Sequence, residues 1–280
     1  MSHEPQGRFT GIAREAVYSP GKVDADRAIL EATAKALARR GASVRLLEPE
    51  QVDNAGDGTD LVFAMCQGPQ ALAGLRRLEA AGLPVVHRAE AIEACHRVRM
   101  LGLLEAAGVA RPEARLVASE RPGPEALAWV DALGAAGVWV KRGDVHATEP
   151  GDVSRAVGAS EAARALQALS RRGVAAAVLE AHLEGPTFKF YGVVGTGFFR
   201  AFEGDRRDPV PHPPAWPRLA EAAAQALDLG VYGGDLIVDI SGSSWVVDVN
   251  DWPSFSRCRR DAAAAIAQYL LARLREARRA

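Results

Sequence analysis

Segments typical of strands alternate with segments typical of helices through the first 90 residues, and this alternation constrains the fold more than any other feature. The strand-like segments are rich in apolar residues and cover residues 8–18, 42–47, 60–65 and 83–87. The segments between these strands, residues 24–40 and 70–81, each have helical periodicity. Ile29, Leu30 and Leu37, for example, share one face. Strands that alternate with helices favour a parallel sheet covered by helices. We therefore expect residues 1–90 to form a small α/β domain.

The rest of the chain predicts mixed strands and helices in a different arrangement. One helix is expected over residues 89–107 and another over residues 260–278. A β ribbon, PTFKFYGVVGTGFFRAFEG, and a hairpin, GGDLIVDISGSSWVVDVND, lie between them. Because 280 residues favour more than one domain, we expect a central unit over residues 91–178 and a C-terminal unit over residues 179–280.

The charge balance and the cysteine content exclude several classes of function. The chain has 34 basic and 35 acidic residues, whereas a nucleic-acid-binding protein usually has a basic surplus. The three cysteines are far apart and form no CxxC pair, which supports neither a disulfide framework nor a thiolate zinc site. The polar N-terminus lacks the apolar core of a signal peptide, and the longest apolar run, residues 262–272, is too short to span a membrane. We expect no nucleic-acid or membrane partner and a cytoplasmic location, and self-association into a homo-oligomer is compatible with the sequence.

Three polar side chains in the hairpin form a candidate site. If the hairpin has a four-residue SGSS loop, Ile240 pairs with Trp245, and Asp235 lies opposite Asn250 and diagonal to Asp248. All three polar side chains then point to one face, because residues two apart in a strand share a face. The apolar residues that alternate with them predict a core surface on the other face: Leu236, Val238, Ile240, Trp245, Val247 and Val249.

The two carboxylates of this face would lie roughly 7–8 Å apart as diagonal neighbours. Their repulsion favours either a well-solvated face or a cation between them. Two carboxylates and an amide oxygen are hard ligands that suit Mg²⁺, and the same donors are compatible with Mn²⁺. The residues alone are compatible with both a solvated face and a metal site. Asp239 and Asp251 are expected to be surface acids.

Basic side chains in two other strands suit a phosphate bound near such a metal. Lys141 ends the apolar strand GVWVK, where it can face a cleft or simply be solvated. In the ribbon, a two-residue GT turn would pair Gly195 with Phe198 and place Lys189, Tyr191 and Arg200 on one face. The sequence contains neither a GxxxxGK[ST] phosphate loop nor a GxSxG elbow.

The order of these segments resembles the ATP-grasp superfamily. The resemblance covers about residues 10–272 and includes HRVRMLGLLEAAGVARPEARLV, WVKRGD, VLEAHLEGPTFKFYGVVG and WVVDVNDWPSF. In particular, the chain resembles the ligases similar to the ribosomal-protein S6 glutamate ligase (RimK-like) and the LysX-type enzymes. This implies an α/β ATP-grasp fold, with a small N-terminal parallel α/β domain and two α+β subdomains that clasp ATP. It also implies an ATP- and Mg²⁺-dependent enzyme that joins a small-molecule carboxylate to an amine through an acyl phosphate.

The resemblance implies roles for individual residues. The metal ligands would be Asp235, Asp248 and Asn250, with Asp248 standing where the family usually has Glu. The nucleotide would contact Arg97, Lys141, Glu180, Ala181, His182, Leu183 and Glu184. Within that set, Lys141 would contact the α- and β-phosphates, residues 180–183 would be the hinge whose backbone reads adenine, and Glu184 would lie near the ribose. Lys189 and Arg200 would stabilise charge on the transferred phosphoryl group.

The sequence departs from the family pattern after Lys141. RGDVHATEPGDVSRA stands where the family has a glycine-rich lid, so residues 142–155 are a candidate cover for the phosphates and His146 a candidate contact. The acceptor substrate would lie on residues 19–26 and 257–260, and the positive charge of the arginines in residues 257–260 suits a carboxylate or a phosphate. FKFYGVVG and Asp248 are also similar to inositol-phosphate kinases. An ATP-grasp small-molecule kinase therefore stays an alternative, as does a protein that binds ATP without catalysis.

Overall fold

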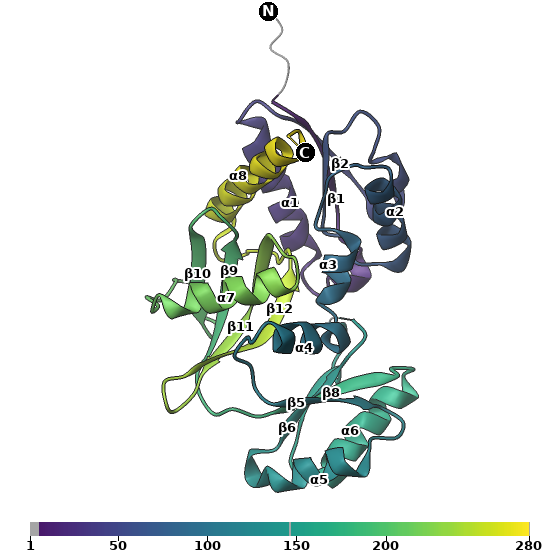
Figure 1. The fold of residues 1–280 in the computed structure, drawn as a ribbon, viewed down its shortest axis with the longest axis vertical. Coiled ribbons are helices and arrows are strands. Elements are labelled where there is room, and N and C mark those ends of the chain that lie inside the picture. The colour runs from purple at the N-terminus through teal and green to yellow at the C-terminus, as the bar shows by residue number, and fades with distance from the viewer. Residues whose placement is uncertain (1–5, 146, 280) are drawn as a thin grey trace, which may run out of the picture.

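The computed structural model describes residues 6–145 and 147–279, which form three four-stranded sheets with helices packed around them (Figure 1). The N-terminal sheet is parallel, in the order β2-β1-β3-β4. Its strands are β1 (Arg8–Ile12), β2 (Ser43–Leu47), β3 (Leu61–Ala64) and β4 (Val85–Val86). The helices of this part are α1 (Val23–Ala38), α2 (Pro69–Ala80) and α3 (Ala89–Ala94), with short 3-10 helices η1 (Ala16–Tyr18) and η2 (Pro49–Asn54). The predicted parallel α/β arrangement is confirmed, although the first strand ends at Ile12.

The central sheet is antiparallel, in the order β5-β8-β6-β7. Its strands are β5 (Ala114–Ala118), β6 (Val138–Arg142), β7 (Val153–Ala156) and β8 (Ala176–Ala181). The helices are α4 (Arg97–Ala106), α5 (Pro124–Ala132) and α6 (Ala159–Arg171), with the 3-10 helix η3 (Gly134–Ala136). The single helix expected over residues 89–107 is two helices, because His96 has an extended backbone (φ −68°, ψ 132°) between α3 and α4.

The C-terminal sheet is also antiparallel, in the order β10-β9-β11-β12. Its strands are β9 (Thr187–Val193), β10 (Phe198–Glu203), β11 (Val231–Val238) and β12 (Ser244–Asp251). Helix α7 (Ala215–Ala226) packs on it, in a core cluster that includes Trp216 and Phe190.

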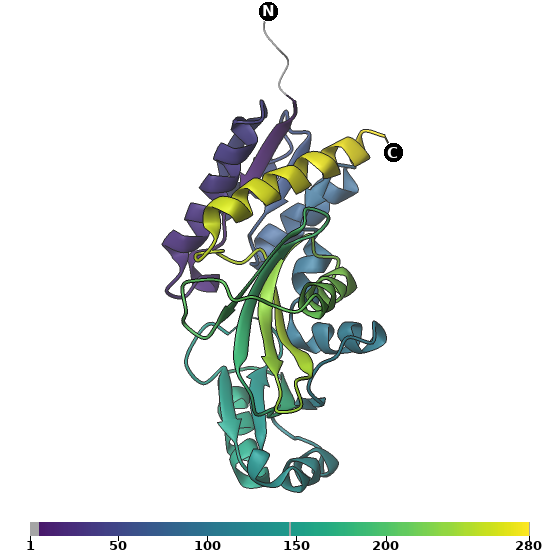
Figure 2. The ribbon, with the colours of Figure 1, turned by 90° about the vertical axis from the view of Figure 1, so that its left-hand side faces the viewer.

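Helix α8 (Arg259–Ala277) returns to the N-terminal part of the molecule and packs along α1 (Figures 1 and 2). Ile266 and Leu270 of α8 are fully buried in one core with Leu30 and Leu37 of α1, and the same core reaches Tyr191 of the C-terminal sheet. The expected division at residues 1–90, 91–178 and 179–280 therefore stays a prediction. None of the helices in the described part of the chain is long and apolar enough to cross a membrane.

Candidate active site

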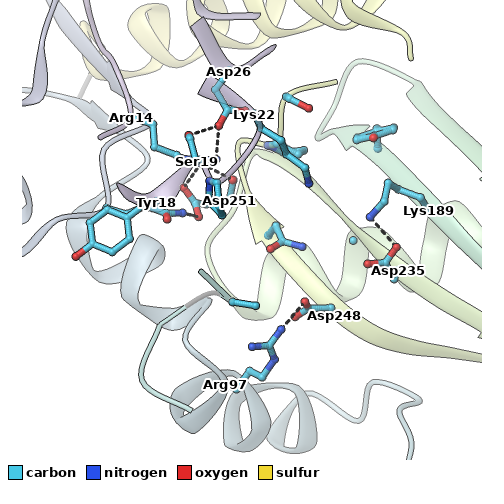
Figure 3. Close-up of a pocket in the computed structure, with 18 residues that line it drawn as sticks. Arg14, Tyr18, Ser19, Lys22, Asp26, Arg97, Lys189, Asp235, Asp248 and Asp251 are labelled. Atoms are coloured by element: carbon cyan, nitrogen blue, oxygen red, sulfur yellow. Dashed lines mark hydrogen bonds and ion pairs between the residues drawn. The ribbon is translucent and has the colours of Figure 1, made fainter. Parts of the chain in front are cut away.

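A cavity of about 250 Å³ lies between the N-terminal part and the C-terminal sheet (Figure 3). The segments around β1, α1 and β3 line it with Arg14, Tyr18, Ser19, Pro20, Lys22, Asp26 and Gln67. The chain between β3 and β8 adds Arg97 and Ala147. The C-terminal sheet and the turn after it add Lys189, Tyr191, Gly234, Asp235, Asp248, Asn250, Asp251, Pro253 and Ser254. The cavity thus brings together the three predicted metal ligands, Lys189, Arg97 and the predicted substrate segment.

The predicted face of the hairpin is confirmed, but its predicted register is wrong. Asp235 lies directly opposite Asp248, and Asn250 lies opposite Gly233. At this end of the hairpin the pairing differs from the predicted one by two residues. A shift of two conserves the face of every side chain, whereas a shift of one would reverse it. Asp235, Asp248 and Asn250 therefore still point together into the cavity.

Two local features explain the difference in register. The carboxylate of Asp239 accepts hydrogen bonds from the backbone N–H groups of Ser241 and Ser243 and from Trp245 Nε1, at 2.8, 3.0 and 2.8 Å, so residues 239–243 form the loop. Ile240, predicted to pair in the strand, is 89% exposed. A β-bulge between Asp235 and its neighbour leaves one extra residue on β12.

Because of the bulge, the core face of the hairpin also differs from the predicted one. Leu236 pairs with Val246, and Val246 and Val249 are buried. Val247, predicted to face the core, is the extra residue and is only partly buried.

Each carboxylate of the predicted metal site has a cationic partner. Lys189 Nζ donates to Asp235 Oδ1 at 2.8 Å, within the C-terminal sheet. Arg97 Nη2 donates to Asp248 Oδ2 at 2.9 Å, from the first turn of α4. The Arg97 pair is the more buried, with side chains 8% and 17% exposed. The resemblance assigns Arg97 to the nucleotide and Lys189 to the transferred phosphoryl group, and in this structure they pair with Asp248 and Asp235.

Arg200 lies on the predicted face of the ribbon but outside this cavity. It pairs directly with Tyr191, because residues 194–197 form a four-residue turn where the sequence predicts a two-residue one. The shift is again two residues, so Lys189, Tyr191 and Arg200 share a face as predicted. The guanidinium of Arg200 donates to the carbonyl of Phe199 at 2.8 Å and lies 5.2 Å from the ring centroid of Phe198. Arg200 is not among the described residues that line the cavity.

Lys141 forms a buried ion pair with Glu180. Val138 and Val140 of β6 are fully buried in the core with α5 and α6, so Lys141 lies on the opposite face of the sheet. Its Nζ donates to Glu180 Oε1 at 2.5 Å, and the two side chains are 6% and 9% exposed. Burial raises the pKa of the Glu180 carboxyl, and the Lys141 charge opposes this shift. Phosphates that bind Lys141 would compete with Glu180 for its ammonium group.

The predicted adenine hinge begins with Glu180 and Ala181, the last two residues of β8, and continues beyond the strand. The backbone N–H of Ala181 donates to Glu113 O at 2.8 Å, and that of His182 donates to Gly137 O at 3.1 Å. The ring of His182 accepts a hydrogen bond at Nδ1 from Trp139 Nε1, at 3.1 Å. Two amides of the hinge are therefore used within the protein, and Leu183 and Glu184 continue the chain toward β9.

The segment predicted to cover the phosphates is anchored at its base by one carboxylate. Asp152 is fully buried and accepts hydrogen bonds from the N–H of Thr148 and from Arg142 and Arg172. Burial opposes ionisation, but these hydrogen bonds lower the pKa of Asp152 to about 2. Ala147 of this segment lines the cavity. His146, the predicted contact, lies outside the described residues.

The two predicted substrate segments differ in their position. Ser19, Pro20, Lys22 and Asp26 line the cavity, as expected for residues 19–26. Residues 257–260, in contrast, are not among its described lining residues. Arg257, for instance, donates to Gly204 O at 2.8 Å, at the end of β10.

Asp251, predicted to be a surface acid, is 1% exposed. Arg14 Nη2 donates to its Oδ2 at 3.3 Å (Figure 3). Gln67 Nε2 donates to its Oδ1 at 2.7 Å. Arg14 and Gln67 lie just after β1 and β3, at positions where a polar residue gives no local signal of burial. Only the packing of the N-terminal part against β12 brings these groups together, so sequence reasoning missed them.

The donor chemistry of the hairpin fits a hard divalent cation. Among the described residues, no group of three His, Cys, Asp or Glu side chains could hold a metal. The set in the cavity consists instead of two opposed carboxylates and one amide oxygen, which are the oxygen donors that Mg²⁺ takes alongside water and phosphate.

Comparisons with solved structures place the architecture among known folds. No protein-family model matches the chain, and no curated protein matches its sequence. The D-alanine–D-alanine ligase from Bacillus anthracis, solved in complex with ATP, is 14% identical and has a TM-score of 0.74, with 99% of each chain covered. The D-cycloserine synthetase DcsG is 20% identical, with a TM-score of 0.72 over 96% of this chain and 100% of the other. A RimK-domain ATP-grasp protein from Sphaerobacter thermophilus is 23% identical, with a TM-score of 0.69 over 94% and 99% of the two chains. The likeness spans nearly the whole of each chain, and it shows a shared fold.

Proposed function

We propose that this chain, which has the ATP-grasp fold, is an ATP- and Mg²⁺-dependent ligase that joins a small-molecule carboxylate to an amine. One observation carries the proposal. Asp235 and Asp248 oppose each other, with Asn250 on the same face, in a cavity that also receives Lys189 and Arg97. Solved structures of this fold include two kinds of ligase or synthetase, which supports the same class of reaction here.

ATP is proposed to bind between the central and C-terminal sheets. Lys141 would contact the α- and β-phosphates after leaving Glu180, and Arg97 would reach the nucleotide from α4. Residues 180–183 would read the adenine through the backbone, and Glu184 would lie near the ribose.

Asp235, Asp248 and Asn250 are proposed to hold Mg²⁺, or Mn²⁺ in its place. The metal would offset the negative charge of the phosphates. Loading the site would free Lys189 and Arg97 from their carboxylate partners for contact with phosphate oxygens.

The proposed reaction has two steps. A carboxylate oxygen of the substrate attacks the γ-phosphorus, the bond to the β-phosphate oxygen breaks, and an acyl phosphate and ADP form. The amine then attacks the acyl carbon and inorganic phosphate leaves, which gives the amide. Lys189 and Arg200 would stabilise the charge on the phosphoryl group during transfer. The acceptor would occupy the end of the cavity lined by residues 19–26.

A screen of carboxylic acids and amines, read by ADP release and by product mass, tests the proposal. A ligase gives ADP, phosphate and an amide. An ATP-grasp small-molecule kinase, the alternative that FKFYGVVG and Asp248 suggest, gives ADP and a phosphate ester with polyols in the same screen. A protein that only binds ATP gives no ADP with any acceptor. Either of the last two results would overturn the ligase assignment.

A further inference from the structure

Asn250 depends on its backbone for its orientation. Asp248 and Asp235 are each fixed by an ion pair, with Arg97 and Lys189. The side chain of Asn250, in contrast, has no hydrogen-bond partner among the described residues, although it lines the cavity. Whatever holds the end of β12 therefore also determines the backbone position from which the Asn250 amide reaches into the cavity.

The residue after Asn250 is held by the N-terminal part of the molecule. The side chain of Asp251 is 0% exposed, and its two oxygens accept from Gln67 and Arg14. These donors follow β1 and β3, far from β12 in sequence. A buried carboxylate with partners on both oxygens resists rotation, because any other position would leave charges unpaired.

Arg14 also holds the bend that ends β12. Its Nη2 donates to the carbonyl oxygens of Asp251 and Trp252, both at 3.1 Å, and its Nε donates to Met65 O at 3.0 Å. Trp252 has φ 33°, in the left-handed region that a bulky residue adopts only where the surrounding structure imposes it. Its buried ring stacks on Phe63 of β3, with centroids 5.7 Å apart. The bend is therefore fixed by the N-terminal domain through both side chain and backbone.

We propose that Arg14, Gln67 and Asp251 are positioning residues that orient Asn250 for the divalent cation, so that the N-terminal domain completes the metal site of the C-terminal sheet. This inference rests on the proposed function, since it assigns Asn250 to the metal. It is distinct from a purely structural role. An ion pair that only joins two domains would change stability and leave the ion affinity of the folded protein unchanged.

Mn²⁺ binding to the full-length protein tests the inference without requiring turnover. Free Mn²⁺ is measured by electron paramagnetic resonance in the presence of a non-hydrolysable ATP analogue. Asp251→Asn removes the charge that faces Arg14, and we expect it to weaken Mn²⁺ binding about tenfold or more, as loss of a partner behind a metal ligand does. Gln67→Met removes one hydrogen bond to Asp251 and should weaken binding by about threefold, below the usual range for such partners. It also serves in place of Asp251→Asn if that variant does not fold.

Asp60→Asn is the matched control. Asp60 pairs with Arg8 and Arg278 away from the cavity, so its loss breaks an arginine–carboxylate contact of the N-terminal domain without touching β12. We expect its Mn²⁺ affinity to equal that of the wild type. If Asp251→Asn and Gln67→Met also keep the wild-type affinity, the positioning role is refuted while the metal site stands. If the wild-type protein itself binds no Mn²⁺ with the nucleotide, the proposed function fails, and this inference fails with it.

Discussion

The substitution Glu180→Gln separates two proposed effects of the Lys141–Glu180 pair: it stabilises the fold, and it competes with ATP for Lys141. The pair is buried, with Nζ and Oε1 2.5 Å apart. The substitution removes the negative charge, keeps a hydrogen-bond acceptor and leaves the backbone of the hinge unchanged. The ammonium of Lys141 then lies in a buried position, 6% exposed, without the carboxylate partner that it has in the wild type.

The expected loss of stability follows from that burial. Removing one partner of a buried ion pair costs about 3–5 kcal/mol, because the remaining charge stays desolvated. The retained amide acceptor places Glu180→Gln at the lower end, about 3 kcal/mol. At roughly 2 °C per kcal/mol for a chain of this size, the melting temperature of the nucleotide-free protein should fall by about 6 °C.

ATP should have the opposite effect in the same variant. Phosphates that bind Lys141 as proposed compete with the Glu180 carboxylate for its ammonium group in the wild-type protein, whereas the variant has no carboxylate at this position. We expect ATP to bind at least about tenfold more tightly, a gain of about 1.4 kcal/mol. Thermal unfolding and calorimetric titration with Mg·ATP measure both effects. Glu113→Gln is the control, because this side chain is 62% exposed and pairs only weakly with Arg115.

Weaker ATP binding in Glu180→Gln would contradict the proposed competition between Glu180 and the phosphates for Lys141. It would mean that the carboxylate of Glu180 contacts the nucleotide itself and that Lys141 does not exchange one anionic partner for another.

Three further substitutions test other parts of the site. Asp248→Asn should abolish Mg²⁺-dependent turnover and also lower the melting temperature, because Arg97 loses a mostly buried partner; Asp239→Asn should keep full activity in the same assay, because the amide oxygen of Asn still accepts hydrogen bonds from the loop N–H groups of Ser241 and Ser243. Arg200→Ala should lower kcat far more than it weakens ATP binding, since charge builds on the phosphoryl oxygens during transfer; normal kcat with weak ATP binding would contradict this role. Burial favours the protonated form of Asp152, but hydrogen bonding outweighs burial and holds the pKa at about 2, below its ordinary value of 3.8. The ionised carboxylate therefore stabilises the fold fully above a pH of about 3.8. This contribution is lost as the pH falls from about 3.8 to about 2, and Asp152→Asn should therefore be less stable at neutral pH and show a shallower loss of stability with acid.

The sequence predicts the faces of strands better than their register. Asp235, Asp248 and Asn250 share a face as expected, because alternation along a strand is a local property. The pairing itself depends on the Asp239 turn and on a bulge at Asp235, and neither has a pattern that fixes it in advance. Both register errors are shifts of two residues at the positions that matter, which is why the predicted site survives them.

Local sequence patterns do not predict which side chains pair with each other in the folded protein. Lys141 and Lys189 are identified as candidate cations from their strands, but their pairing with Glu180 and Asp235 follows from how strands come together in the sheets. Asp251 is the clearest case. Because Asp251 ends its strand, one residue after the cavity-facing Asn250, a surface position is the natural expectation. Only the docking of the N-terminal part makes it a buried group.

Trapping with hydroxylamine shows whether the reaction passes through an acyl phosphate, as a carboxylate–amine ligase requires. The protein is incubated with Mg·ATP, hydroxylamine and the carboxylic acid that releases ADP in the screen, without the amine. We expect a hydroxamate of that acid in an amount equal to the ADP formed, because hydroxylamine attacks the acyl carbon in place of the amine. ADP release with a stable phosphate ester and no hydroxamate would contradict it.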